Sequence, residues 1–277
     1  MLIRSPIILY ILKKPPMSHS IPRIIHQMWF DRIDPRMDSV PDKYRHYEEY
    51  MESWRSNHPQ YEYIFWNGDR IEELWNREEL KRWRQYYDRI DVHIQKCDFT
   101  RYAILYLYGG LYVDLDFISL RPIDDLLNRE ILVTLEPKEN AMISGMTCIA
   151  NNIMGSVKGN EFWIGLMDYI VDGAHLKNRV IRDAVSITGP YALYCFYQSL
   201  DVRPDIITDV CLLTPMTLTG SLSQSCTLDK SYCYTRWTEG TGWHLDKDNI
   251  KSVSIGYTKI GILVLLLISV LVIVLIA

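Results

Sequence analysis

The sequence predicts one α/β domain in which strands and helices alternate, followed by an apolar segment. Short runs rich in β-branched and aromatic residues occur at 61–66, 111–113 and 131–135, with stretches of helical spacing around them. Strands interleaved with helices are typical of a largely parallel, doubly wound sheet. The 277 residues are enough for one sizeable domain. Residues 260–277 contain no charged side chain and form the apolar segment.

The overall composition excludes two classes of protein. The net charge of −4 gives no basis for nucleic acid binding, so we expect no nucleic acid partner. The six cysteines form no C-x-x-C pair, which argues against a structural zinc site. Cys226 and Cys233 are a candidate disulfide in an oxidising compartment, and buried free thiols are the alternative.

The first twenty residues form a separate N-terminal segment. Its apolar run, 7–12, is shorter than the roughly 20 residues of a membrane span and below the usual length of a signal peptide's apolar region. An interfacial membrane anchor and an irregular N-terminus both remain open. The domain then begins with a strand at Pro22 that has Ile24 and Ile25 as core residues.

Two residues near the first strand invite a functional interpretation. Trp29 follows this strand and is a candidate wall for a nucleotide base, although a core position explains it equally well. For His26 we expect a buried hydrogen bond rather than a metal, because no neighbouring residue has ligand spacing. Residues 31–60 are polar and favour helix, and 61–66 alternate as a strand before a turn at 67–69.

A highly charged helical region follows. Between residues 69 and 89, Leu74, Trp75, Leu80 and Trp83 recur at helical spacing among Glu, Arg and Lys. Such a pattern is typical of a solvated face over an apolar stripe, and we assign it no chemistry.

The stretch from 97 to 117 carries the candidate catalytic chemistry. Helical spacing runs from about 92 to 108 and ends at Gly109-Gly110, where a left-handed backbone can stop the helix. A buried strand is predicted at 111–113. It leads into Asp114-Leu-Asp116, at the edge where open α/β sheets bind ligands. Asp98 and Arg101 are three residues apart and share a face of the helix.

Two carboxylates spaced by one residue suit a divalent cation that also holds a diphosphate. Mg2+ and Mn2+ prefer oxygen ligands and are commonly held by one or two carboxylates plus substrate phosphates. Such a cation would neutralise charge on a departing nucleoside diphosphate. Residues 246–248 also read Asp-Lys-Asp, but no strand precedes them. A surface ion pair remains the simpler alternative for Asp98 and Arg101.

The elements after the aspartates are less distinctive. A short helix is predicted at 121–127, a strand at 131–135 and a helix resuming at 162–167. Residues 151–159 are small or carry amides, which permits a sugar or acceptor to approach closely. Asn152 and Ser156 are candidates for the acceptor side, with an ordinary polar turn as the alternative. Thr188-Gly189-Pro190 opens a further helix, whose free N–H groups can receive an anion or a hydroxyl.

The residues of this core resemble a known family. Ile94-Gln-Lys-Cys-Asp98, Arg101-Tyr102 and the run from Tyr108 to Asp116 closely resemble the core of glycosyltransferase family 32, the DXD sugar transferases. Further similar blocks follow in family order at 21–29, 54–66, 121–127, 153–163, 188–190 and 237–244. The resemblance implies a GT-A-like, Rossmann-like nucleotide-sugar transferase domain over residues 21–250. It also implies transfer with retention at the anomeric carbon.

The same resemblance implies roles for particular residues. Asp116 would bind Mn2+ or Mg2+, Asp114 would contact ribose or sugar hydroxyls and share the metal, and Asp98 and Arg101 would hold the donor sugar. These four are the candidate catalytic residues. The donor-binding set consists of Trp29, Asp98, Arg101, Asp114 and Trp243.

Residues 237–244 resemble the final block of the family, which implies that they close over the nucleotide and complete the metal shell. This sequence reads Thr241-Gly242-Trp243 where the commoner form has serine and tryptophan. For the further metal ligand we expect His244, and then Glu239. A surface loop is the alternative for both residues.

Within the family, residues 94–98 and 153–159 are most similar to the inositol phosphorylceramide mannosyltransferases. The similarity implies transfer of a hexose, mannose from GDP-mannose, to a hydroxyl of a lipid-linked acceptor. One alternative is a UDP-sugar-dependent transferase acting on a glycan or protein. Another is a catalytically inactive, membrane-tethered sugar-binding subunit. A regulatory membrane subunit is a further candidate partner.

The apolar segment predicts a membrane anchor. At about 1.5 Å per residue, a helix over 260–277 covers roughly 27 Å, so residues 258–277 are expected to form a single C-terminal transmembrane helix. Lys247, Lys251 and Lys259 precede it, which favours a cytoplasmic catalytic domain. Cellular members of the family generally work in the Golgi lumen. We therefore expect a Golgi or ER-type endomembrane, with the side that the domain faces left open.

Overall fold

The computed structural model describes residues 20–29, 40, 42–176 and 183–235. The N-terminal segment 1–19, the segment 258–277, and Trp243, His244 and Glu239 lie outside the described residues. Within the described part of the chain, no helix has the length and apolar character needed to cross a bilayer.

The central sheet has five strands in the order β2-β1-β3-β6-β5. Strands β1, β2, β3 and β5 run in one direction, because β1 pairs in parallel with β2 and β3, while β6 is antiparallel to both β3 and β5. The prediction of an α/β fold is therefore confirmed, but the sheet is mixed. Their bounds are β1 Ile24–Met28, β2 Glu62–Trp66, β3 Gly110–Val113, β5 Ile131–Leu132 and β6 Ile153–Ser156.

Strand β6 lies within the segment 151–159, whose small and amide residues did not predict a strand. Its small residues serve packing: a Cβ added at Gly155 would lie 2.9 Å from Leu111 Cδ2 and 3.1 Å from Ile21 Cδ1. The absence of a side chain at this position lets Leu111 and Ile21 pack directly against the strand. Ser156, expected on the acceptor side, pairs with Gly110 at the end of β6 remote from Asp114, so that expectation is wrong.

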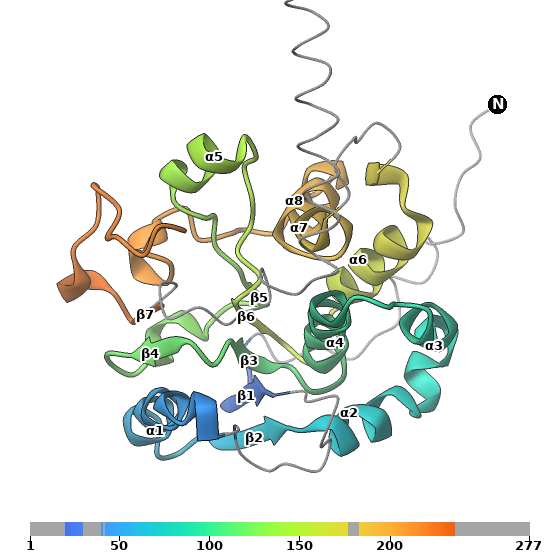
Figure 1. Ribbon diagram of the computed structural model, residues 1–277, viewed down its shortest axis with the longest axis horizontal. Coiled ribbons are helices and arrows are strands. Elements are labelled where there is room, and N and C mark those ends of the chain that lie inside the picture. Colours follow the sequence, from blue (N-terminus) through green and yellow to red (C-terminus); the bar gives the residue numbers. More distant parts are fainter. Residues whose placement is uncertain (1–19, 30–39, 41, 177–182, 236–277) are drawn as a thin grey trace, which may run out of the picture.

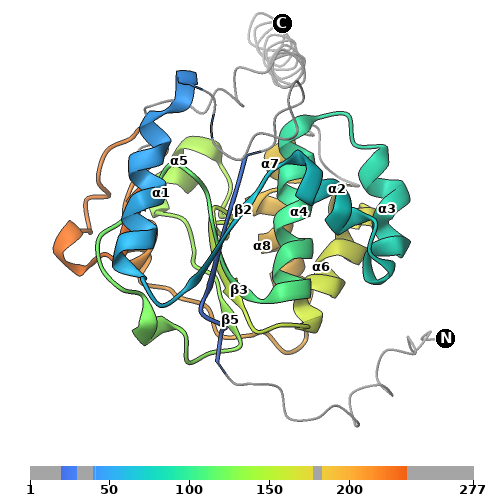
Figure 2. The ribbon, with the colours of Figure 1, turned by 90° about the horizontal axis from the view of Figure 1, so that it is seen from below.

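Helices cover both faces of the sheet (Figure 1). Helix α1 lies on one face, and α2, α3, α4, α6 and α8 gather on the other, as Figure 2 shows. A second, two-stranded sheet pairs β4 with β7. The bounds of these elements are α1 His46–Asn57, α2 Gly68–Trp75, α3 Lys81–Asp88, α4 His93–Tyr108, α5 Lys138–Ser144, α6 Glu161–Asp172, α7 Ala184–Ile187, α8 Pro190–Ser199, β4 Phe117–Ser119 and β7 Cys233–Thr235.

Helix α4 lies at the centre of the largest apolar cluster. Phe99, Tyr102 and Leu105 are fully buried. The Trp75 ring stacks between Phe99 and Tyr87, at centroid distances of 5.5 Å and 4.3 Å. The predicted apolar stripe of residues 69–89 is confirmed by this packing. Because α4 is enclosed, its polar side chains Asp98 and Arg101 are also held inside the protein.

The junction between α4 and β3 depends on two glycines. Gly109 and Gly110 have φ values of 68° and 85°. Residues other than glycine rarely adopt such values. A Cβ at Gly109 would lie 2.6 Å from Lys158 N, and one at Gly110 would lie 2.7 Å from Ile24 O. The predicted helix, turn and strand are confirmed here, and the tight turn fixes where the aspartates after β3 emerge.

His26 makes the expected buried hydrogen bonds. Its Nε2 lies 2.9 Å from Gly109 O, and Trp66 Nε1 donates to Nδ1 at 3.1 Å. Nδ1 is therefore an acceptor, which leaves the proton on Nε2 to bond Gly109. Burial lowers the pKa of His26 to about 4, so the ring is neutral at physiological pH.

The disulfide differs from the candidate pair. Cys226 is bonded to Cys211, at a Cα–Cα distance of 5.1 Å. Cys233 is a buried free thiol in β7. The predicted pairing of Cys226 with Cys233 is therefore wrong. Cys233 lies in β7, which pairs with β4. Cys211 lies beside Cys226 in the region that precedes β7.

Candidate active site

The two aspartates lie at the carboxyl edge of the sheet, as predicted. Asp114 directly follows β3, and its backbone N–H donates to Asn152 O at 2.8 Å. Asp116 precedes β4 and is only 8% exposed. Thr235 of β7 donates its hydroxyl to Asp116 Oδ2 at 2.8 Å. The short second sheet therefore holds Asp116 in place.

Asp98 and Arg101 of α4 reach the same edge from inside the protein. Arg101 Nη2 lies 3.3 Å from Asp98 Oδ1, and its Nη1 lies 3.4 Å from Asp114 Oδ2. Both side chains are almost fully buried. The surface ion pair offered as an alternative is wrong, because a buried guanidinium here joins the helix carboxylate to the first aspartate of the DXD motif.

Three further residues complete this network. Asn151 donates from Nδ2 to Asp98 Oδ1 at 2.9 Å and accepts from Arg101 Nη1 at its backbone oxygen at 2.7 Å. Thr188 donates to Asp98 Oδ2 at 2.9 Å. Tyr112 of β3 donates to Asp114 Oδ1 at 2.8 Å.

Sequence reasoning did not single out Asn151 or Tyr112 for this site. Asn151 and Asn152 directly precede β6, a strand that the sequence did not reveal. Tyr112 reads as an ordinary core residue of β3, and its position two residues before Asp114 places it on the same side of the strand. That spacing was the available signal.

Burial and excess negative charge perturb all three carboxyl groups. Burial raises the pKa of Asp98 to about 6, against the opposing effect of Arg101. Burial, and then the neighbouring Asp114, raise the pKa of Asp116 to about 7. Burial also raises the pKa of Asp114. Burial disfavours the charge on Arg101, but Asp114 and the other nearby acidic groups keep its pKa well above the ordinary value.

This electrostatic arrangement fits a divalent cation at the DXD motif. Three carboxylates face one guanidinium, and a cation beside Asp114 and Asp116 would offset the excess negative charge. Among the described residues, no group of three or more His, Cys, Asp or Glu side chains is arranged to hold a metal. Two carboxylates match a Mg2+ or Mn2+ site whose remaining ligands are phosphates and water.

Two buried polar atoms in the site have no hydrogen-bond partner among the described residues. One is a donor, Arg101 Nε, and the other is an acceptor, Asn152 Oδ1. Buried polar groups are normally paired. Complementary groups left over at one edge are suited to a polyhydroxyl ligand, which offers both donors and acceptors.

Trp29 follows β1 at the same edge of the sheet. It is partly buried, and its ring lies 4.8 Å from that of Tyr44 and 6.4 Å from that of Tyr47. The cluster against which it packs includes Leu115, the middle residue of the DXD motif. This location is compatible with both interpretations of Trp29.

The family comparison matches this region of the chain. A family model described as the glycosyltransferase sugar-binding region containing the DXD motif matches residues 45–132. That range includes Asp98, Arg101, Asp114 and Asp116, together with β2, α4 and β3.

Several known proteins are similar over a longer stretch. An uncharacterized glycosyltransferase, L373, of Acanthamoeba polyphaga mimivirus is 26% identical over 230 residues, covering 80% of this chain and 84% of that protein. Inositol phosphoceramide mannosyltransferase 3 of Schizosaccharomyces pombe is 30% identical over 188 residues, covering 68% of this chain and 48% of that protein. Mannosyl phosphorylinositol ceramide synthase SUR1 of Saccharomyces cerevisiae is 29% identical, covering 84% and 54%.

The chain thus spans about half the length of these two yeast relatives. Among solved structures, the PaToxG glycosyltransferase aligns with a TM-score of 0.46 at 16% identity, over 65% of this chain and 70% of that one. We infer nothing further from that likeness. The DXD motif at the carboxyl edge of the sheet lies inside the matched region, so residues 45–132 match the sugar-binding region of glycosyltransferases that contain a DXD motif.

Proposed function

We propose that this protein transfers mannose from GDP-mannose to a hydroxyl of a lipid-linked acceptor, such as inositol phosphorylceramide, with retention at the anomeric carbon. The observation that carries the proposal is the buried cluster of Asp98, Arg101 and Asp114 beside Asp116. The names of several similar proteins, which are mannosyltransferases of inositol phosphoceramide, support mannose and inositol phosphoceramide as substrates. The domain is proposed to be GT-A-like, since its parallel strands present the cluster at their carboxyl edge.

The donor would lie across this edge. A bound Mn2+ or Mg2+ would stabilise the charge that develops on the leaving diphosphate. Asp116 and Asp114 would hold that cation, with His244 as the proposed further ligand. Arg101 would present its unpaired Nε to the donor, because its other two nitrogens are engaged by Asp98, Asp114 and Asn151.

Asp98 orients rather than attacks in this proposal. Its Oδ1 accepts from Asn151 and faces Arg101, and its Oδ2 accepts from Thr188. A carboxylate with both oxygens engaged is poorly placed to form a covalent bond with a sugar. Its role would be to fix the position of Arg101 and, through it, the donor hexose. Trp29 and Trp243 remain proposed contacts for the donor.

Donor turnover tests the proposal most directly. The full chain in detergent would be assayed with GDP-mannose, UDP-glucose, UDP-galactose and UDP-GlcNAc, with Mn2+ present or chelated, and with inositol phosphorylceramide supplied. We expect release of GDP that depends on metal and is abolished in Asp116→Asn. Arg23→Gln is a matched control, because Arg23 pairs with Asp124 on the exposed surface.

Other outcomes would redirect the proposal. Release of UDP alone would replace mannose by another hexose and favour the UDP-sugar alternative. Binding of acceptor without turnover of any donor would contradict the transferase and favour an inactive sugar-binding subunit. Inverted stereochemistry of the product would contradict the retaining mechanism, whichever donor is used.

A further inference from the structure

One surface of the protein contains almost no charge. No Asp, Glu, Lys, Arg or His lies between Glu139 and Lys158, or between Asp209 and Asp229, in a chain in which 23% of residues are charged. Exposed surfaces of soluble domains normally carry both signs of charge at roughly that frequency or above it. Two long uncharged stretches therefore call for an explanation, particularly where they are exposed.

The two stretches meet at α5. Asn140 Oδ1 accepts from Leu218 N at 2.8 Å. Glu139 Oε1 accepts from Ser223 Oγ at 2.9 Å and from Gln224 N at 3.0 Å. The first turn of α5 is therefore fastened to the hairpin in which Met216 pairs with Leu222. Together α5 and residues 216–224 form one surface, which we call the α5 surface.

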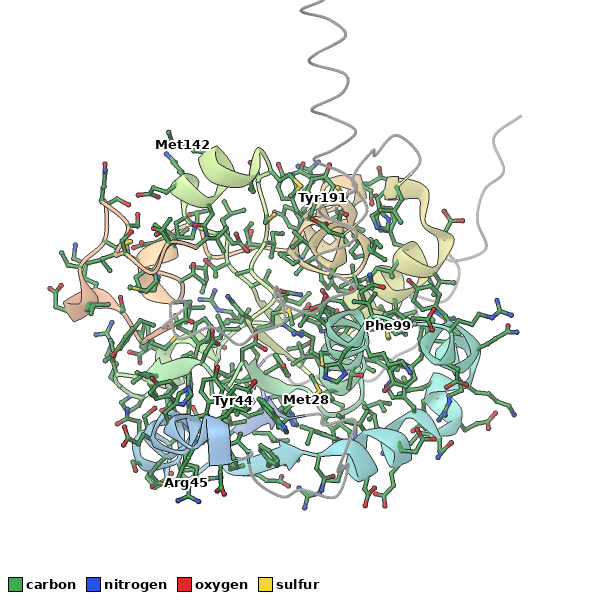
Figure 3. All side chains as sticks on the ribbon, in the orientation of Figure 1. Met28, Tyr44, Arg45, Phe99, Met142 and Tyr191 are labelled. Atoms are coloured by element: carbon green, nitrogen blue, oxygen red, sulfur yellow. A yellow bond between two sulfur atoms is a disulfide. The ribbon has the colours of Figure 1, made fainter. Side chains whose placement is uncertain are left out.

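The α5 surface exposes large apolar side chains. Met142 is 84% exposed, and Leu218 and Leu222 are 38% and 37% exposed. Figure 3 shows Met142 at the outer edge of the molecule on α5. The one acidic side chain on the fastened turn, Glu139, is already engaged by Ser223 and Gln224. Lys138, the first residue of α5, is exposed and is the other charged residue on this surface. Exposed apolar residues with so little surrounding charge are typical of a surface that contacts something other than water.

This surface projects from the edge of the sheet that carries the candidate active site. The chain leaves that edge at Glu136 and returns at Cys148, where Glu136 N donates to Cys148 O at 3.1 Å. Ala150 N then donates to Thr134 O at 2.8 Å, and Asn151 follows in the Asp98 network. Met146 is five residues from Asn151, so the two lie within about 18 Å of each other.

We propose that the α5 surface docks on a lipid bilayer and turns the active edge toward it. The uncharged segment 260–277 supports a bilayer as the occupant, because its composition suits a membrane anchor. Thr235, the last described residue before that segment, lies at the active edge, where its hydroxyl donates to Asp116. The inference rests on the proposed lipid-linked acceptor, which would otherwise have to leave the bilayer to react.

The scarcity of charge on the α5 surface predicts the kind of contact. Docking would depend on insertion of apolar side chains and not on attraction to anionic lipids. Binding should therefore persist on neutral vesicles and in about 1 M salt, where the Debye length falls to about 3 Å. A protein partner or a second copy of this chain would also shield the α5 surface from water. Neither would bring the side chains of the α5 surface into contact with lipid.

The experiment places an environment-sensitive fluorophore on Met142→Cys in the full chain, reconstituted with phosphatidylcholine vesicles. Val202→Cys is the matched control, because Val202 is 88% exposed. Ile207 pairs in parallel with Thr134, which follows β5. Val202 precedes Ile207 and therefore lies toward the edge of the sheet opposite the active site. The unsubstituted chain, labelled identically, corrects for the four free cysteines among the described residues. The fluorescence measurement is made without added acceptor, donor or metal.

We expect a blue shift at position 142, loss of its emission with a lipid-borne nitroxide, and protection from aqueous iodide, none of which occurs at position 202. Equal exposure of both labels to iodide would overturn the proposal, as would a chain that fails to bind vesicles. Protection from iodide without quenching from lipid would also overturn it and indicate a protein occupant.

A second measurement separates this inference from the transferase proposal. Met142→Asp should raise KM for acceptor in vesicles, while donor hydrolysis without acceptor stays unchanged, because Met142 is not part of the Asp98 network. If donor turnover is absent in the unsubstituted chain, the proposed function fails, and the fluorescence result still decides whether the surface docks. An unchanged KM for vesicle-borne acceptor would contradict the docking role.

Discussion

The hydroxyl of Thr188 donates a hydrogen bond to Asp98 Oδ2 at 2.9 Å, which ties the start of α8 to the middle of α4. This bond favours the ionised form of Asp98, whose pKa burial raises to about 6. In Thr188→Val the shape is kept and the bond is lost. We expect donor turnover at pH 7 to fall roughly 10- to 100-fold, since a buried hydrogen bond to a charged group contributes about 1.5–3 kcal/mol.

The pH profile distinguishes this effect from a general loss of stability. Removing Thr188 Oγ1 should raise the pKa of Asp98 further, so the turnover of Thr188→Val should recover in part at higher pH. Thr188→Ser retains the hydroxyl and should behave like the natural protein. A uniform loss at every pH in Thr188→Val would show that Thr188 acts only in packing.

Replacing Arg101 by lysine tests whether the planar guanidinium itself is needed. Lysine keeps the charge but cannot contact Asp98, Asp114 and Asn151 O together. We expect donor turnover in Arg101→Lys to fall by more than about 100-fold and the free energy of unfolding to drop by about 3 kcal/mol, as when one partner of a buried ion pair is removed. Urea unfolding and donor release measure the two effects.

The exposed pair of Arg23 and Asp124 supplies the control for that substitution. Arg23 donates from Nη2 to Asp124 at 2.9 Å, but both side chains are accessible to water. Arg23→Lys should leave the free energy of unfolding nearly unchanged, because exposed ion pairs are screened by water. Similar destabilisation in the two variants would contradict the buried network described for Arg101.

Asp116→Asn should stabilise the metal-free protein while abolishing activity. The pKa of Asp116 rises from 3.8 to about 7 on folding. Between these values the folded state binds more protons than the unfolded state, so this group lowers stability as pH rises. An asparagine side chain does not ionise, so it removes this loss of stability at high pH. We expect the free energy of unfolding of Asp116→Asn to be about 2–4 kcal/mol higher at pH 8. Urea unfolding in the presence of a chelator measures the difference.

Added Mn2+ should reverse the order of stability. The metal binds the ionised carboxylate, so it should raise the melting temperature of the natural protein more at pH 8 than at pH 6. Asp116→Asn should show little response at either pH. If both proteins respond equally to Mn2+, the metal site lies elsewhere.

Two glycines with similar φ but very different ψ, −156° at Gly109 and 13° at Gly145, should respond very differently to alanine. Gly109 and Gly145 have φ values of 68° and 70°. A Cβ at Gly109 would meet backbone atoms of Lys158 and Ser156 within 2.8 Å, whereas one at Gly145 would meet nothing within 4 Å. We expect Gly145→Ala to cost about 1–2 kcal/mol of conformational strain and Gly109→Ala considerably more.

Denaturant midpoints of the two variants check this prediction. Gly109→Ala should also reduce donor turnover in the fraction that remains folded, because the turn sets the position of the strand that leads to Asp114. Equal midpoints would mean that alanine at position 109 accepts both the close contact with Lys158 and the backbone conformation there without extra cost.

Much of the central unit could be predicted because its signals are local. Helical spacing, the Gly109-Gly110 stop and the following apolar strand are consecutive in the sequence, and each has its own physical cause. The face shared by Asp98 and Arg101 also follows from a spacing of three. These features locate the candidate site without knowledge of the rest of the fold.

The remainder could not be predicted because it depends on residues that are distant in the sequence. Thr188 is 90 positions from Asp98, and Thr235 is 119 positions from Asp116. Strand β6 escaped recognition because Gly155 and Ser156 lack the bulk of typical strand residues. Their size makes sense only once Leu111 and Ile21 are known to pack against them. The partner of Cys226 was likewise fixed by the fold and not by spacing.

The chain leaves the edge of the sheet at Glu136 and rejoins it at Cys148, which is hydrogen-bonded to Glu136. The excursion that contains α5 is closed by two backbone hydrogen bonds, Glu136 N to Cys148 O and Ala150 N to Thr134 O. Changes of length between residues 140 and 148 would therefore leave the register of β3, β5 and β6 intact. The region nearest a docking membrane can therefore diversify in length and chemistry among related chains, while the residues that hold the sugar donor keep their geometry.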